Sequence, residues 1–266
     1  SGGKKIRAFL VLESGRFICA INNKTLTKSK YNELIAAASA IEAIHSYSLI
    51  HDDLPAMDNS PVRRGKASNH IKFDYHTAIL AGDGLLSWAF QVIGDSNFIS
   101  NSEKRSEICF VIASAIGPNG MVGGQQADMD YTKHISLDLD KIEWIQYHKT
   151  GALISCCSHV ASILLNASND QKSNLINYAN HIGLAFQIAD DLLDLDGNED
   201  FMGKPIGQDT KNEIPNFELM RIKLIRSLDR DKKILRLISK FYPEKVIKYF
   251  SYKVKISKKE FINMIS

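Results

Sequence analysis

Cysteine is scarce in this sequence, and its spacing argues against metal or disulfide chemistry. Four cysteines occur among 266 residues. None belongs to a Cys-x-x-Cys pair, which disfavours both a zinc site and a disulfide framework. Cys156 and Cys157 are neighbours in a segment with helical periodicity, so their side chains point in different directions. We predict that this pair is buried as small apolar residues in a protein of a reducing compartment.

Long apolar runs are also lacking. No uninterrupted apolar segment reaches the roughly 20 residues needed to cross a bilayer, and no secretory signal pattern is visible. We therefore expect a cytoplasmic protein without stable membrane insertion. No Pro- or Ser-rich linker and no low-complexity tract divides the chain, whose length suits one large domain or two small ones.

Helical periodicity dominates what is present. Between Glu33 and Ile50 the apolar residues recur at the spacing of one helix face. Further helices are predicted over residues 76–95, 104–117, 139–166, 171–196 and 216–238. Short alternating patterns typical of strands are scarce, so the residue pattern by itself predicts an all-α fold.

Positive charge is concentrated near the carboxyl end. The formal net charge is +3, and Lys and Arg greatly outnumber acidic residues in the segment 221–266. Such a segment could meet an anionic membrane or a nucleic acid. We find no pattern of interleaved aromatic and basic residues that supports nucleic-acid binding. We interpret the segment as a solvated pair of helices and predict no nucleic-acid partner.

Two acidic clusters are the most informative feature of the chain. The first contains Asp52, Asp53 and Asp58, and the second contains Asp190, Asp191 and Asp194. Carboxylates this close repel one another, and burying even one unpaired charge costs several kcal/mol or more. A chain that does this twice is expected to bind cations between its carboxylates. Hard oxygen ligands suit Mg²⁺, which keeps its other positions for water and substrate phosphates.

The spacing within the clusters indicates how the carboxylates are presented. Asp190 and Asp194 are four residues apart, so they share one face of a helix. Pro55 must end or distort the apolar helix before it, so Asp58 is expected on a turn. One such cluster alone would be interpreted as a solvated helix end.

Basic residues follow both clusters and disfavour that interpretation. Arg63 and Arg64 come after the first cluster, and Lys204 comes after the second. Guanidinium groups bind phosphate oxygens in a bidentate manner. The pattern therefore favours a site that holds both metal ions and phosphate groups.

Several ordered motifs resemble the trans-prenyltransferases, the short-chain isoprenyl diphosphate synthases of the farnesyl and geranylgeranyl diphosphate type. DDLPAMD followed by RRG is similar to the first aspartate-rich motif in its bacterial form, with a Pro-Ala insertion, and FQIADDLLD is similar to the second. GGKKIR, His45, Ala81-Gly82-Asp83, Gly124-Gln125, Lys149-Thr150-Gly151 and GKPIGQD occur in the family's order. The resemblance runs from Gly2 to about Asp209.

The resemblance implies a fold, a reaction and partners. We expect the all-α isoprenoid synthase fold, with antiparallel helices around a deep central cavity, in a single polyprenyl synthase domain over residues 1–266. The chain starts at the GGKKIR segment, so the family's amino-terminal helices are expected to be missing. The implied reaction joins an allylic diphosphate to isopentenyl diphosphate and releases diphosphate, in a homodimer. Ser60 departs from the family, which commonly has an acidic residue there.

The resemblance also assigns roles to the acidic residues. Three Mg²⁺ ions are implied, two held by Asp52 and Asp58 and the third by Asp190. Asp53, Asp191 and Asp194 would orient these ligands or coordinate only partly. The ions would neutralise the leaving diphosphate as the allylic C–O bond ionises.

The resemblance also assigns substrate-binding roles to residues of this chain. The allylic diphosphate is expected on Arg63, Lys149 and Lys204. The diphosphate of isopentenyl diphosphate is expected on Lys4, Arg7, His45 and Arg64. Thr150 and Gln187 would present oxygen dipoles to the allylic carbocation, and the departing diphosphate would take the proton.

Product length is predicted from the residues before the first aspartate. Tyr47 lies five residues before Asp52, and Ser48 lies four before it. An aromatic residue there together with the Pro-Ala insertion resembles bacterial farnesyl diphosphate synthases, which predicts a fifteen-carbon product. A geranylgeranyl diphosphate synthase stays open as an alternative. So does a non-catalytic partner subunit, although such subunits usually lose one aspartate motif and both are complete here.

Overall fold

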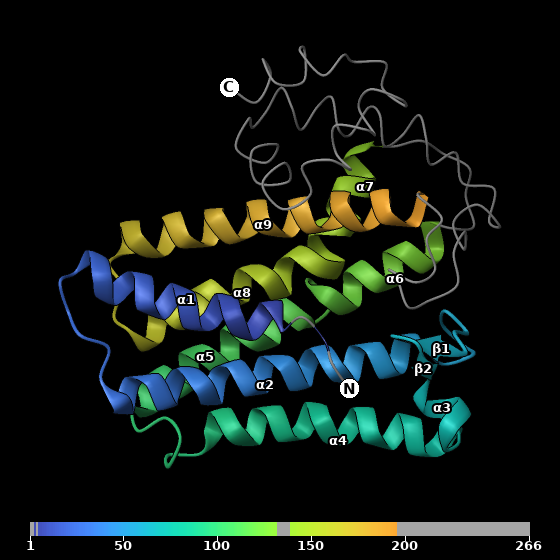
Figure 1. The fold of residues 1–266 in the computed structure, drawn as a ribbon, viewed down its shortest axis with the longest axis horizontal. Coiled ribbons are helices and arrows are strands. Elements are labelled where there is room, and N and C mark those ends of the chain that lie inside the picture. The colour runs from blue at the N-terminus through green and yellow to red at the C-terminus, as the bar shows by residue number, and fades with distance from the viewer. Residues whose placement is uncertain (1–2, 4, 132–138, 196–266) are drawn as a thin grey trace.

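The computed structural model describes residue 3 and residues 5–131 and 139–195, most of which form helices (Figure 1). The helices are α1 (Ile6–Ile21), α2 (Lys28–Asp52), α3 (Asn69–Lys72), α4 (Tyr75–Gly94), α5 (Ser102–Ile116), α6 (Met121–Tyr131), α7 (Leu139–Gln146), the π-helical segment η1 (Tyr147–Gly151), α8 (Ala152–Leu164) and α9 (Asn169–Leu195). A hairpin of two short strands, β1 (Val62–Arg63) and β2 (Lys66–Ala67), follows α2. The predicted all-α class is confirmed.

The predicted helices that lie within the described residues match the observed ones, apart from one π-helical segment and three helices that the sequence pattern did not predict, α1, α3 and α6. The helix predicted over 139–166 contains the π-helical segment η1 between α7 and α8. Helix α6 starts with the glycine-rich stretch Met121-Val122-Gly123-Gly124, which has low helix propensity. The helix predicted over 216–238 lies outside the described residues.

Side-chain caps and a proline set the helix limits around the site. The side chain of Thr27 accepts a hydrogen bond from the backbone N–H of Lys30 at 3.3 Å and starts α2. Asp74 starts α4 in the same way, accepting from Thr77 at 2.6 Å. At its other end α2 stops at Asp52, close to Pro55, as the sequence predicted.

The long helices run side by side along the longest axis of the molecule (Figure 1). Along the chain, α1, α2 and α4 alternate in direction, and the carboxyl ends of α2 and α9 lie at the same end of the bundle. The main packing partners of α2 are α4 and α1, while α8 packs against α1, α5 and α9. The segments that carry the predicted motifs therefore meet at one end of the bundle.

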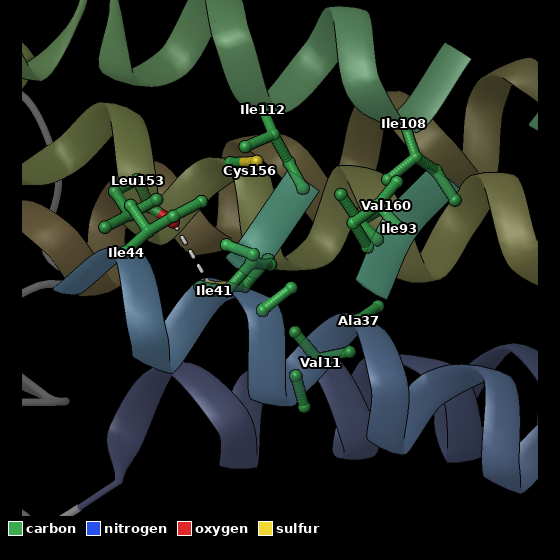
Figure 2. Packing of buried hydrophobic residues seen from close by; sticks show 14 of the residues in the cluster. Val11, Ala37, Ile41, Ile44, Ile93, Ile108, Ile112, Leu153, Cys156 and Val160 are labelled. Atoms are coloured by element: carbon green, nitrogen blue, oxygen red, sulfur yellow. Dashed lines mark hydrogen bonds between the residues drawn. The ribbon is translucent and has the colours of Figure 1, made fainter. Parts of the chain in front are cut away.

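Branched aliphatic side chains from five helices fill the core (Figure 2). Ile41 and Ile44 of α2 face Ile93 of α4, Ile112 of α5 and Leu153 of α8, and each of these side chains is at most 1% exposed. Alanines on α2 let neighbouring helices approach closely, since a small side chain leaves room for the partner. Burial of this apolar surface is the main term that stabilises the bundle.

The predicted burial of the cysteine pair is confirmed. Cys156 and Cys157 are 2% and 0% exposed, and all four cysteines are free. The thiol of Cys157 donates to the carbonyl of Leu153 at 3.2 Å, one helical turn earlier. Burial raises the pKa of Cys157 to about 12, so the thiol stays protonated and unreactive.

Two described segments are long and apolar enough to span a membrane by length and composition alone. They are Tyr75–Gly94, which is α4, and Ser102–Asp130. The second contains the turn at residues 117–120 that separates α5 from α6. Core helices of soluble proteins pass the same test, so this criterion decides little about either segment.

Candidate active site

A tight turn after α2 brings the two outer aspartates of the first cluster together. The backbone N–H of Asp58 donates to the carbonyl of Asp52 at 2.9 Å. The N–H of Ser60 donates to the carbonyl of Asp53 at 3.1 Å, and the Ser60 hydroxyl donates to the carbonyl of Val62 at 2.9 Å. Asp58 is thus presented from a turn, as predicted. Ser60 is 3% exposed and closes this turn through its hydroxyl.

The RRG motif forms the end of a two-residue hairpin. Val62 pairs with Ala67 and Arg63 with Lys66, which leaves Arg64 and Gly65 as the loop. Their φ angles are 54° and 70°, as a type I′ turn requires at both central positions. The hairpin was not predicted, because two-residue strands are too short for an alternating pattern. The hairpin therefore holds the neighbouring residues Arg63 and Arg64 in different environments.

Arg63 is bound to the middle aspartate of the first cluster. Its Nε and one terminal guanidinium nitrogen donate to Asp53 Oδ1 at 2.9 and 2.5 Å, and Asp53 is only 3% exposed. Burial would lower the pKa of Arg63, but the hydrogen bond and charge of Asp53 outweigh it and raise the pKa. The carboxylate of Asp53 is therefore engaged by Arg63 in this structure.

The start of α1 is fixed against α2 beside His45. Glu42 lies one turn before His45, and its Oε1 accepts a hydrogen bond from the backbone N–H of Ala8 at 3.2 Å. Its Oε2 forms an ion pair with Lys5 at 3.3 Å. These contacts hold the first turn of α1, which carries Arg7, close to the His45 side chain.

A group of cations surrounds a neutral histidine at this position. Burial, followed by the positive charges of Arg7 and Arg64, lowers the pKa of His45 to about 3. A Cβ at Gly3 would collide with the Arg64 guanidinium, so that arginine lies against the GGKKIR segment. The structure therefore brings together Arg7, His45 and Arg64, which the sequence placed in one site. Lys4 lies outside the described residues.

Lys149 reaches the same acidic region from η1. Its Nζ lies 2.6 Å from Oδ2 of Asp128 on α6. Burial would lower the pKa of Lys149, but Asp128 first, and then Asp52 and Asp58, raise it. Thr150, the next residue, is half-buried in η1. Single π-helical turns inside α-helices occur frequently at functional sites.

Asp128 was not among the residues predicted from the sequence. The available signal was its position in the same stretch as Gly124 and Gln125, three to four residues later and so on one side of a helix. The amide nitrogen of Gln125 is buried and has no hydrogen-bond partner within the described part of the chain. This side of α6 therefore offers polar groups to the site.

A nearby cation would stabilise the ionised carboxylate of Asp52. Burial raises its pKa to about 6; the charge of Lys149 opposes this shift, and repulsion from Asp58 adds to it. Among the side chains that the structure describes, which exclude those of Asp190, Asp191 and Asp194, no group of three or more potential metal-ligating residues is found. Asp52 and Asp58 are nonetheless hard oxygen donors held together by the turn, which fits a magnesium ion that takes its remaining ligands from elsewhere.

The second acidic cluster lies near the end of the described chain. Asp190, Asp191 and Asp194 are on α9, which continues to Leu195, as the helical spacing predicted. Gln187 lies on the same helix. The side-chain positions of these four residues lie outside the described part of the structure, and so does Lys204. Helix α9 packs against η1, the segment that contains Lys149.

Tyr47 is packed one helical turn before the first cluster. It is 8% exposed, and its ring meets the His51 ring edge-on, with centroids 5.7 Å apart. A ring nitrogen of His51 bonds the carbonyl of Ile79 at 3.0 Å, and a Cβ at Gly82 would collide with that ring. The hydroxyl of Ser48 donates to the carbonyl of His45 at 3.1 Å. Contacts with His51 thus hold the Tyr47 ring in one position.

A helical bundle with an acidic turn, paired arginines and a lysine on a helix bulge has the architecture of the isoprenoid synthases. The sequence profile of the polyprenyl synthetase family matches residues 1–251. The chain belongs to the polyprenyl synthetase family, and the resemblance identified from the sequence is confirmed.

Three relatives illustrate the likeness. A farnesyl diphosphate synthase from Geobacillus stearothermophilus is 45% identical over 214 residues, which are 80% of this chain and 68% of the relative. A geranylgeranyl diphosphate synthase from Cyanophora paradoxa is 38% identical over 213 residues, again 80% and 68% of the two chains. The crystal structure of a geranyltransferase from Helicobacter pylori, complexed with magnesium and isoprenyl diphosphate, superposes with a TM-score of 0.75 at 27% identity, covering 96% of this chain and 85% of that one.

The raised pKa of Asp52 predicts that its charge destabilises the metal-free protein. The folded-state pKa is about 6 and the ordinary value is 3.8, so stability is lost as the pH rises from about 4 to about 6. We expect Asp52→Asn to raise the unfolding free energy at pH 7.5 by about 1 to 3 kcal/mol, since one pKa unit corresponds to about 1.4 kcal/mol. Denaturant unfolding without metal measures this gain.

The same unfolding measurement, repeated at another pH, on another variant and with Mg²⁺, provides the controls. The gain should disappear at pH 4, where Asp52 is protonated, and Asp58→Asn should have a smaller effect because Asp58 is exposed. Adding Mg²⁺ should stabilise the unaltered protein more than the Asp52→Asn variant, since a ligand stabilises the state that binds it. An Asp52→Asn variant that is less stable at pH 7.5 contradicts the electrostatic account.

Proposed function

We propose that this chain is a farnesyl diphosphate synthase that condenses isopentenyl diphosphate with dimethylallyl or geranyl diphosphate. The observation that carries the proposal is the presence of two separate cation groups. Lys149 and Arg63 act on the acidic turn at Asp52, whereas Arg7 and Arg64 act more strongly on His45 than Arg63 does. Two anionic substrates need two such groups. Relatives 40% to 45% identical to this chain carry the name farnesyl diphosphate synthase.

We base the proposed metal site on the carboxylate oxygens of the two acidic clusters. Asp52 and Asp58 would hold magnesium on one side and Asp190 on the other, with Asp53, Asp191 and Asp194 in supporting positions, and three ions are proposed. When bound, the ions supply positive charge that neutralises the leaving diphosphate. Asp53 supports the site through Arg63, to which it is bound.

Arg63, Lys149 and Lys204 bind the allylic diphosphate in this proposal. Their positive charges stabilise the negative charge that develops on the diphosphate as the C–O bond breaks. Thr150 and Gln187 present oxygen atoms to the allylic carbocation, and η1 places Thr150 directly after Lys149. Neither residue attacks the cation.

Lys4, Arg7, His45 and Arg64 hold the second substrate. The pKa of His45 is lowered to about 3 by burial and by its cationic neighbours. His45 is therefore neutral at physiological pH and can donate one hydrogen bond without adding charge. The double bond of isopentenyl diphosphate then attacks the carbocation, forming the new C–C bond. The departing diphosphate takes the proton that is released.

Tyr47 sets the length of the product in this proposal. The growing chain would extend behind the first aspartate cluster, where the Tyr47 ring is held against His51. A rigid aromatic wall there stops growth at fifteen carbons. The similarity to a geranylgeranyl diphosphate synthase keeps a twenty-carbon product as the second candidate. The packing of Tyr47 favours the shorter one, with Ser48 beside it on α2.

Exposed apolar side chains on α4 and α5 support the proposed homodimer of a cytoplasmic enzyme. Leu80 and Trp88 of α4 are 65% and 45% exposed, and Phe110 of α5 is 73% exposed. Gly84 lies between the two α4 residues, and a Cβ there would have nothing within 4 Å. Monomers rarely leave such surfaces in water, so we assign this face to a second copy of the chain.

The reaction and the role of Tyr47 are tested by product length. With Mg²⁺, labelled isopentenyl diphosphate and geranyl diphosphate, the protein should form mainly the fifteen-carbon alcohol after dephosphorylation. Tyr47→Ala should lengthen the product because it removes the wall. Tyr47→Phe keeps the ring and should leave the length unchanged. Chromatographic sizing of the alcohols gives the answer, and an unaltered product from Tyr47→Ala shows that another residue forms the wall.

The separation of the two substrate sites is tested at Arg64. Arg64→Asn should raise KM for isopentenyl diphosphate about tenfold or more and leave KM for the allylic substrate nearly unchanged, because a charge-assisted contact is lost at one site only. Asn is chosen because it tolerates positive φ and preserves the hairpin. Equal increases of both KM values would contradict the assignment.

The dimer is tested by light scattering on a sizing column. The unaltered protein should have twice the mass of the chain at micromolar concentration. Leu80→Asp should shift it toward the monomer, since a charge would be buried in the interface. Phe17→Asp, a matched change at a 52% exposed position on α1, should leave the dimer intact. A monomeric unaltered protein rules out this assignment.

A further inference from the structure

The backbones of α6 and η1 touch at one glycine. A Cβ at Gly124 would collide with the backbone nitrogen of Lys149 and lie 2.7 Å from the carbonyl carbon of His148. No side chain fits there without moving one of the two segments. The absence of a side chain at position 124 therefore sets the distance between α6 and the helix bulge.

This close approach places Asp128 opposite Lys149. Asp128 is four residues after Gly124 and lies on the same face of α6. Its Oδ2 is 2.6 Å from Nζ of Lys149, with both side chains about one-third exposed. The geometry is that of a charge-assisted hydrogen bond between two segments that are already held together by their backbones.

Contacts with α7 also hold η1. The rings of Trp144 and His148 stack with centroids 3.9 Å apart. A ring nitrogen of His148 bonds the carbonyl of Trp144 at 2.7 Å. The backbone that carries Lys149 is thus fixed by these contacts and by Gly124, and its long side chain is fixed at the far end by Asp128.

A lysine side chain is a flexible stem with a point charge at its end. Ordering such a chain when a ligand binds costs conformational entropy, and a side chain that is already ordered avoids that cost. The Lys149 ammonium also acts on Asp52 and Asp58. Its charge therefore acts on the carboxylates to which the metal and the allylic diphosphate are assigned.

We propose that Asp128 is a positioning residue that holds the ammonium group of Lys149 in place for the allylic diphosphate. The inference rests on the proposed function, because that function assigns Lys149 to the allylic diphosphate. Asp128 itself touches no substrate in this scheme. Supporting groups of this kind typically contribute about 10- to 100-fold to binding or activity.

A double-mutant cycle tests the coupling. Kinetics are measured with geranyl diphosphate varied and isopentenyl diphosphate saturating, for the unaltered protein, Asp128→Asn, Lys149→Gln and the double variant. Asp128→Asn should lower kcat/KM for geranyl diphosphate about tenfold or more, and should change it less than about twofold when Lys149 is already Gln. KM for isopentenyl diphosphate should stay unchanged.

Asp130→Asn is the matched control. Asp130 carries the same charge on the same helix and accepts a hydrogen bond from Gln126 at 3.1 Å. Its substitution should leave kcat/KM within about twofold of the unaltered protein. Thermal unfolding of all variants shows whether Asp128→Asn acts through folding, and a loss of kcat/KM that follows loss of folded protein overturns the inference.

A binding measurement separates this inference from the proposed function. Calorimetric titration with inorganic diphosphate and Mg²⁺ is repeated for the same four proteins, and the loss of affinity in Asp128→Asn should again vanish when Lys149 is Gln. An unaltered protein that shows this coupling but forms no prenyl product contradicts the proposed function alone. An active unaltered protein in which the two substitutions multiply their effects overturns the role of Asp128.

Discussion

The site depends on one electrostatic constraint, the placement of Asp52 at the carboxyl end of a long buried helix. The helix dipole of α2 puts partial negative charge at that end, and the turn brings Asp58 close to it. Burial and repulsion together raise the pKa of Asp52 to about 6. Positive charge at this point therefore favours the ionised carboxylate, and Lys149 and Arg63 are the described groups that supply it.

The cations themselves are held by acidic partners. Asp53 binds Arg63 from within the same motif, and Asp128 binds Lys149 from another helix. Each pair keeps a basic side chain ordered next to Asp52 before any ligand arrives. The group around His45 differs, because burial and the positive charges of Arg7 and Arg64 lower the pKa of His45 to about 3 and keep the histidine neutral.

Some local features of the candidate site were readable from the sequence because residue spacing encodes local geometry. Pro55 placed Asp58 on a turn, and the interval between Asp190 and Asp194 placed both on one helix, which α9 confirms. The RRG hairpin was missed because its strands have two residues each. Helix α6 was missed because glycines weaken its helical signal, and packing on η1 stabilises it instead.

The sequence by itself determined the class of fold, the family and the identity of the acidic and basic residues, because helical periodicity and motif spacing are local properties of the chain. Only the tertiary structure decided which acid meets which base. The pairing of Asp53 with Arg63 follows from a turn and a hairpin. The pairing of Asp128 with Lys149 follows from contact between two helical segments at Gly124. The second pairing depends on the packing of separate helical segments, since its partners are 21 positions apart in sequence, and no local pattern records it.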